Sequence, residues 1–175
     1  LKTGLGMQVD LLLMEGGQLE QAFAEMSRVH DLSEMSPAQS SALLSNLRDG
    51  GVELVIANTA VSGRLTRAIS ASGLRVISLI HELPKLIRDY GLESAVSDLA
   101  AYSDKVVVPS DAVLGGLGDF VDVASLSNKL VLRPQGLFTR SKYRGAANLT
   151  KARSNLRAKL GLHADARIVL TVGYA

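Results

Sequence analysis

Short runs of apolar and β-branched residues alternate along this chain with segments of helical period, and no other feature of the sequence constrains the fold as strongly. The runs Leu54–Ala57 and Val106–Val108 are continuously apolar and do not alternate with polar residues. Such runs are typical of strands buried on both faces, as in a parallel sheet covered by helices. The sequence therefore predicts an α/β protein with a doubly wound, Rossmann-like parallel sheet.

The same pattern gives the bounds of the expected elements. Strands are expected at Val9–Met14, Arg28–Leu32, Val52–Ala57, Arg75–Ile80, Lys105–Val108, Lys129–Arg133 and Arg167–Val172. Helices are expected at Gln18–Met26, Pro37–Arg48, Val61–Ser72, Pro84–Asp89, Glu93–Tyr102, Asp111–Leu117 and Leu149–Leu160. Proline opens two of these helices, at Pro37 and Pro84, and glycine follows the helices Pro37–Arg48 and Val61–Ser72, at Gly50 and Gly73, as helix termini favour.

Composition excludes several classes of function. The longest apolar runs have the length of strands and are far shorter than the ~20 residues of a membrane span. Cysteine is absent, so disulfides, thiolate metal ligands and cysteine nucleophiles are excluded. The three histidines, His30, His81 and His163, lack metal-type spacing. The glycine patterns Gly4-Leu5-Gly6 and Gly115-Gly116-Leu117-Gly118 do not follow a strand, as a dinucleotide fingerprint requires. We expect no zinc site and find no self-sufficient catalytic set.

Positive charge is concentrated near the end of the sequence. From Lys129 to Leu162 there are nine basic residues and no acidic one. Such a segment can meet an anionic partner, for example a membrane surface. The simpler interpretation, which we favour, is a solvated linker at Pro134–Asn148 followed by a solvated helix face. Regular aromatic interleaving is absent, so we expect no nucleic-acid binding.

Polar or glycine residues directly follow most of the expected strands. Because the carboxyl ends of parallel strands open into the crevice where α/β proteins bind ligands, these residues are candidates for a site. The sets are Glu15-Gly16-Gly17, Asn58-Thr59, His81-Glu82, Ser110-Asp111 and Gln135-Gly136. Loops are polar in any case, so each set alone is weak and their shared edge carries the prediction.

Two of these sets have competing interpretations. An imidazole and a carboxylate at His81-Glu82 can hydrogen-bond sugar hydroxyls or steer a phosphate. Alternatively, Glu82 complements the positive end of the helix that opens at Pro84, and His81 fills a pocket. Ser110 suits the N-cap of the following helix, which by itself explains a serine there, and phosphate binding is the second interpretation.

The order of these segments resembles the N-terminal domain of the retaining GT-B glycosyltransferases of family 4. The similar segments are Val52–Thr59, Ile77–Glu82, Ser103–Ser110 and Leu132–Gly136. In addition, Ser154–Leu162 followed by Arg167–Gly173 is similar to the helix and first strand that open the nucleotide-sugar domain of that family. The resemblance covers nearly the whole sequence.

The resemblance implies transfer of a sugar, with retention, from a nucleotide-sugar co-substrate to a saccharide or lipid-linked acceptor, as in polysaccharide biosynthesis. It implies no cofactor, no obligatory metal, and a cytoplasmic location or a peripheral one at the inner face of the membrane. His81 matches the family's histidine near the transferred sugar. The acceptor cleft would be lined by Asn58, Thr59, His81, Glu82, Ser110, Gln135 and Gly136.

The sequence also departs from the family pattern. The family's paired glutamates have no counterpart, since no two glutamates are eight positions apart, and Gln135 stands where the family often has asparagine. We therefore expect an inactive fragment of a longer enzyme, truncated at both ends. Its parts would be an acceptor-side domain at 1–134 without its first strand, a linker at 135–148, and the start of the nucleotide-sugar domain at 149–175.

The expected absence of the first strand has a physical consequence. That strand would be central, between Val9–Met14 and Val52–Ala57, so its absence exposes two apolar edges that invite pairing. One hypothesis is that Arg167–Val172 fills the gap from another molecule, in a swapped dimer. The simpler alternative is that residues outside the given sequence complete the fold. The competing function is a non-catalytic α/β binding module whose basic segment meets an anionic membrane. A different enzyme on this fold, such as a nucleotide-sugar epimerase, is a third alternative.

Overall fold

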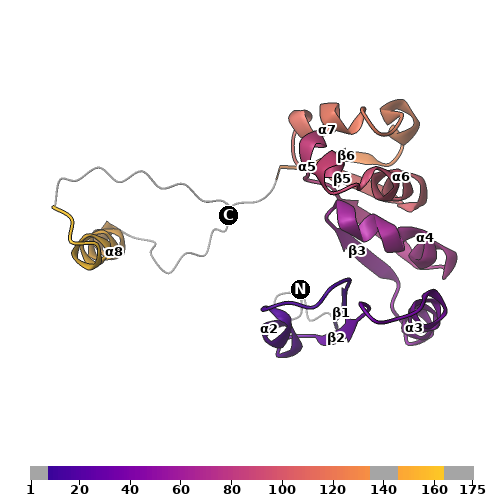
Figure 1. The fold of residues 1–175 in the computed structure, drawn as a ribbon, viewed down its shortest axis with the longest axis horizontal. Helices are drawn as coiled ribbons and strands as arrows, with labels where there is room; N and C mark the ends of the chain where they lie inside the picture. Colours follow the sequence, from indigo (N-terminus) through magenta and orange to yellow (C-terminus); the bar gives the residue numbers. More distant parts are fainter. Residues whose placement is uncertain (1–7, 135–145, 164–175) are drawn as a thin grey trace. The chain divides into compact units, whose positions relative to one another are not determined.

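The computed structural model of this chain describes residues 8–134 and 146–163. Its contacts divide the chain into two compact units, Leu1–Gln135 and Gly136–Ala175. The first unit holds two parallel sheets flanked by helices (Figure 1). The prediction of an α/β fold with a parallel sheet is therefore confirmed.

The smaller sheet comes first in the sequence. It pairs β1 (Asp10–Leu13) with β2 (Arg28–Asp31), and the short helix α2 (Glu20–Ala24) connects them. The next helix, α3 (Pro37–Asp49), begins at Ser36 with reciprocal capping. The Ser36 hydroxyl accepts the Gln39 N–H, and the Gln39 side chain accepts the Ser36 N–H at 2.8 Å.

The larger sheet has the strand order β3-β4-β5-β6, and all its pairs are parallel. Its strands are β3 (Leu54–Asn58), β4 (Arg75–Leu79), β5 (Lys105–Val108) and β6 (Leu130–Leu132). The connections contain the 3-10 helix η1 (Ala60–Ser62), the helices α4 (Gly63–Ala71), α5 (Pro84–Asp89), α6 (Glu93–Tyr102) and α7 (Asp111–Leu117), and the 3-10 helix η2 (Val123–Leu126). The expected strand Arg167–Val172 lies outside the described residues.

The core of this unit lies between the larger sheet and its helices. The strands contribute Val76, Val106 and Val108, and α6 contributes Val96 and Leu99, all of them fully buried. Helices α4 and α6 pack closely because Gly63 has no side chain. A Cβ at this position would come to 2.0 Å from the carbonyl oxygen of Ala95. A glycine is therefore required at this contact.

One polar pair lies inside the core. The hydroxyls of Ser78 in β4 and Ser103, which follows α6, are 2.6 Å apart. Both residues are buried. Each hydroxyl thereby satisfies the other, which removes the cost of burying either one alone.

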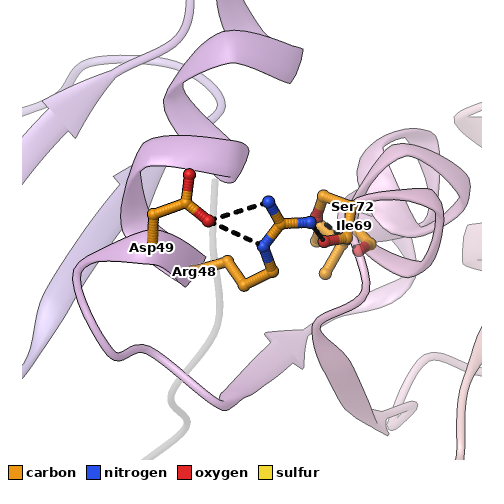
Figure 2. Close-up of polar contacts among 4 residues, drawn as sticks. All are labelled: Arg48, Asp49, Ile69 and Ser72. Carbon is orange, nitrogen blue, oxygen red and sulfur yellow. Dashed lines mark hydrogen bonds and ion pairs between the residues drawn. The ribbon is translucent and has the colours of Figure 1, made fainter.

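Helix α3 is joined to the end of α4 by an arginine (Figure 2). The guanidinium of Arg48 donates to the carbonyl oxygen of Ser72 at 2.9 Å and to Asp49 at 2.8 and 3.0 Å. A cation is favourable at this place because the last carbonyls of a helix carry partial negative charge. Helix α3 also contributes the buried Leu44 to the core cluster, and Leu12 of β1 packs against the same cluster.

The second unit contains one described helix, α8 (Ala146–Lys159). It begins three residues before the expected start at Leu149. The rest of the expected linker, 135–145, lies outside the described residues. Among the helices in the described part of the chain, none has the length and hydrophobicity that crossing a membrane requires.

Candidate functional site

The carboxyl ends of β3, β4 and β5 bring three of the candidate loops to one edge of the larger sheet. Asn58 is the last residue of β3 and is the register partner of Leu79 at the end of β4. The residues Thr59, His81 and Ser110 follow β3, β4 and β5 in turn. Gln135 and Gly136 lie outside the described residues, and Glu15-Gly16-Gly17 follows β1 in the smaller sheet. The strand register thus places the candidate residues that follow β3 next to those that follow β4.

Glu82 binds these two loops together. Its Oε1 accepts the backbone N–H of Ala60 at 3.0 Å, and its Oε2 accepts the backbone N–H of His81 at 3.1 Å. The side chain is only 13% exposed, and Ala60 is fully buried. Hydrogen bonds to an ionised acceptor are stronger than neutral ones, particularly where water is excluded. Glu82 therefore fixes the position of both loops.

The partner of Glu82 differs from the one suggested by the sequence. The alternative to ligand binding was that its carboxylate complements the helix opening at Pro84. Instead, the carboxylate binds the first N–H of η1, which leads into α4. Negative charge is favourable at this position because the first N–H groups of a helix are positive. The interaction joins residues 22 positions apart and so could not be inferred from local sequence.

Thr59 has a strained backbone. Its φ of 76° and ψ of 157° make it the one residue other than glycine with positive φ in the described part of the chain. This conformation costs a β-branched residue about 1–3 kcal/mol and persists only where the surroundings impose it. The Thr59 N–H donates to Leu79 at 3.0 Å, and its carbonyl accepts the Ser62 hydroxyl at 2.6 Å. Strain of this kind is concentrated at functional sites.

His81 presents a partly open imidazole beside this turn. Its side chain is 34% exposed, and Nε2 lies 3.8 Å from Oε1 of Glu82, which is too far for a hydrogen bond. The preceding residue, Ile80, is buried, and its N–H donates to Val107 in β5 at 3.0 Å. The backbone of His81 is thus held from both sides, while its ring nitrogens remain available to a ligand.

Ser110 caps α7, as one of its two interpretations expected. Its hydroxyl oxygen accepts the N–H of Val113 at 3.3 Å. A hydroxyl that accepts one bond can still donate its proton. Capping therefore accounts for the serine, and contact with a ligand stays a prediction.

The structure also places together a pair that sequence analysis did not single out. In the smaller sheet, Nε2 of His30 lies 2.8 Å from Oδ1 of Asp10, and Arg28 lies 3.8 Å from the same oxygen. The pairing of Asp10 with Arg28 in adjacent strands explains the arrangement, since alternate residues share one face. The contact between His30 and Asp10 could be predicted only if the register of β1 and β2 were known.

One carboxyl group at the end of β2 has a shifted pKa. The backbone N–H of Ser33 donates to Asp31 at 2.9 Å and holds the pKa of this exposed carboxyl below its ordinary value. Within residues 8–134 and 146–163, no group of three or more histidine, aspartate or glutamate side chains is placed to hold a metal ion. The chemistry that the candidate site offers is hydrogen bonding by an imidazole, an amide and hydroxyls.

Comparison with models of protein families, with curated proteins and with solved structures finds no match to this chain. The fold is that of a Rossmann-like α/β protein, and the candidate loops follow β3, β4 and β5 at the carboxyl edge of the larger sheet.

Proposed function

We propose that this chain is the acceptor-side part of a retaining glycosyltransferase that moves a sugar from a nucleotide-sugar to a saccharide or lipid-linked acceptor. The observation that carries the proposal is the partly exposed imidazole of His81, fixed through Glu82 beside the strained turn at Thr59. Imidazole, amide and hydroxyl groups at one crevice edge suit the hydroxyl groups of a sugar. The family resemblance of the ordered loops supplies the reaction.

In this proposal the 175 residues do not catalyse transfer alone. The paired glutamates and the donor-phosphate contacts of the family would come from a nucleotide-sugar domain that the longer protein contributes. The reaction would use no cofactor and no obligatory metal. His81 would hydrogen-bond the transferred sugar, and Asn58 and Thr59 would contact the acceptor.

The test is a transfer assay on the longer protein that contains this chain, with a panel of nucleotide-sugars. His81→Ala is expected to lower kcat/KM about tenfold or more, as the loss of one hydrogen bond to the reacting sugar implies. His163→Ala, at a histidine of the second unit, is the matched control. Unchanged turnover in His81→Ala would remove this residue from the site. A longer protein that transfers no sugar from any donor would refute the proposal.

A second candidate function rests on α8. Between Ala146 and His163 the chain has four basic residues and no acidic one. Leu149, Leu156 and Leu160 are exposed, and their spacings of seven and four residues place them on one side of the helix. Leucines beside lysines and arginines suit the surface of an anionic membrane. This candidate is a non-catalytic α/β module that docks on such a surface.

Cosedimentation with vesicles tests this second candidate. The chain is expected to bind vesicles that contain phosphatidylglycerol and to release them at high salt. Removing two charges, by Lys151→Gln with Arg153→Gln, is expected to weaken binding about thirtyfold, since each basic residue near an anionic surface contributes about 1 kcal/mol. Lys85→Gln with Arg75→Gln, two exposed residues of the first unit, is the control. Equal binding to uncharged phosphatidylcholine vesicles would contradict this function.

A further inference from the structure

The carboxylate of Glu82 occupies a position of the kind that anionic ligands use in other α/β proteins. The 3-10 helix η1 and helix α4 follow each other without a break, from Ala60 to Ala71. The first N–H of this helical stretch donates to Oε1 of Glu82 at 3.0 Å. Phosphates and carboxylates bind at helix N-termini because the free N–H groups there carry partial positive charge. In this protein a side chain of the chain itself already takes that position.

The second oxygen of Glu82 is also engaged by the backbone. Oε2 accepts the N–H of His81 at 3.1 Å, and the side chain keeps 13% of its surface exposed. An ionised carboxylate has about four lone-pair positions and no proton to donate. Two of these positions are used by Ala60 and His81. A ligand group that approaches the remaining ones must therefore donate a proton.

A sugar hydroxyl and a phosphate group behave differently beside such a carboxylate. A hydroxyl can donate to Glu82, and a second hydroxyl of the same sugar can bond the open imidazole of His81. A phosphate group at neutral pH carries a charge of about −1.5 to −2 and offers mainly acceptor oxygens. It would face another acceptor of like charge, which is unfavourable. Glu82 therefore favours an uncharged, hydroxyl-bearing group.

The other charges at this edge act in the same direction. The segments at the carboxyl ends of β3, β4 and β5 contain two carboxylates, Glu82 and Asp111, and neither lysine nor arginine. Asp111 is exposed and lies in the first turn of α7, directly after the cap at Ser110. The segments concerned are 58–63, 80–84 and 109–111. Their sequence gives this edge a net negative charge.

Three basic residues lie just beyond these segments. Arg64 in α4 and Arg133 after β6 are exposed, so ions in the solvent screen their charge. Lys85 in α5 forms an ion pair with Asp89. Among residues 8–134, neither a lysine nor an arginine forms an ion pair with Glu82, and its one basic neighbour is the imidazole of His81. The negative charge of Glu82 therefore acts on a ligand at this edge.

We propose that Glu82 determines the specificity of this site: it admits an uncharged, hydroxyl-bearing group of the acceptor and excludes phosphate and carboxylate groups. The inference deepens the proposed function, on which it rests for the role of the bound molecule as acceptor. It favours sugar hydroxyls over phosphate as the ligands of His81 and Glu82. A lipid-linked acceptor would hold its phosphate away from β3 and β4 and present a sugar hydroxyl to them.

Binding of matched probes to the 175-residue chain tests the exclusion without requiring transfer. The probes are glucose, galactose, mannose, their 6-phosphates and inorganic phosphate, followed through the amide NMR signals of Ala60 and His81. The neutral hexose is expected to bind at least about tenfold more tightly than its 6-phosphate, and inorganic phosphate is expected to leave both amides unshifted. Phosphate that shifts these amides, equal binding of hexose and 6-phosphate, or no binding by any neutral hexose would overturn the proposal.

Three charge-removing variants identify the group responsible. Glu82→Gln keeps the shape of the side chain and one acceptor oxygen, and it is expected to lower the preference for the neutral hexose at least about tenfold. Asp111→Asn removes an exposed charge and should lower the preference only about twofold, an effect that high salt abolishes. Glu53→Gln, at an 84% exposed glutamate at the amino end of β3, is the matched control and should change nothing. An unchanged preference in Glu82→Gln would overturn the role of Glu82.

The same acceptors in the transfer assay on the longer protein separate this inference from the proposed function. The expected kcat/KM is at least about tenfold higher for the neutral acceptor than for the phosphorylated one, and Glu82→Gln should reduce this ratio. Transfer that favours the phosphorylated acceptor would keep the proposed function and overturn the inference. Preferential binding of neutral hexoses without transfer from any donor would refute the proposed function and support the specificity inferred for the site.

Discussion

The carboxylate of Glu82 is the most direct target for a test of the candidate site. Replacing Glu82 with alanine leaves the N–H groups of Ala60 and His81 without the acceptor that each now has. The N–H of Ala60 lies at a fully buried residue. Leaving a buried donor unsatisfied costs about 1–3 kcal/mol, so the two together cost about 2–6 kcal/mol.

Part of this cost is recovered because the turn at Thr59 can relax once Glu82 no longer holds Ala60. Relaxation returns the strain of about 1–3 kcal/mol that the positive φ stores. The midpoints of these two ranges are about 4 and about 2 kcal/mol. The expected net effect of Glu82→Ala is therefore a loss of about 2 kcal/mol in the free energy of unfolding, measured by urea denaturation at 25 °C. Glu53→Ala, at an exposed glutamate, is the control and should stay within about 0.5 kcal/mol.

A double-mutant cycle separates the two contributions. Thr59→Gly removes the strain, and after the entropy cost of glycine it should stabilise the chain by up to about 2 kcal/mol. In the Glu82→Ala background the same change should gain less, because the turn has already relaxed. If Glu82→Ala left stability unchanged, or if Thr59→Gly were destabilising, the account of a carboxylate that holds a strained turn would be wrong.

Other predictions concern packing, capping and acid stability. Gly63→Ala should lower the free energy of unfolding by about 1–3 kcal/mol or more through overpacking against α6, whereas Gly115→Ala, which meets nothing within 4 Å, should raise it by about 0.5–1 kcal/mol; thermal unfolding measures both, and equal effects would contradict the close contact. Ser110→Ala should cost about 0.5–2 kcal/mol because α7 loses its N-cap, while Ser110→Thr should retain most of the stability in urea. Because the pKa of Asp31 lies below its ordinary value of 3.8, its ionised form adds stability above that pH and loses it on acidification. Asp31→Asn should therefore reduce the difference in urea midpoint between pH 6 and pH 2, and an unchanged difference would rule out the bond from Ser33.

Much of the architecture could be predicted because it depends on local patterns. Continuous apolar runs located β3, β4 and β5, and Pro37 and Pro84 marked the starts of α3 and α5 correctly. Bounds were less accurate where the pattern is weak: the helix expected at Gln18–Met26 is only Glu20–Ala24. None of its residues is buried, so its termini have little packing to define them.

The geometry of the candidate site could be predicted only in outline. That Thr59 and His81 share an edge followed from the parallel sheet. The positive φ of Thr59 and the partner of Glu82 did not, since both depend on a contact 22 residues apart in sequence. The pair formed by Asp10 and His30 likewise requires the register of two strands.

The buried hydroxyl pair of Ser78 and Ser103 carries a consequence for how sequences of this fold diverge. Replacing one serine with alanine leaves the other hydroxyl in the core without its hydrogen-bond partner. Replacing both serines with small apolar residues is nearly neutral. Evolution should therefore change the two positions together. In an alignment of related chains, they would be expected to covary as serine with serine or alanine with alanine, although 25 residues separate them.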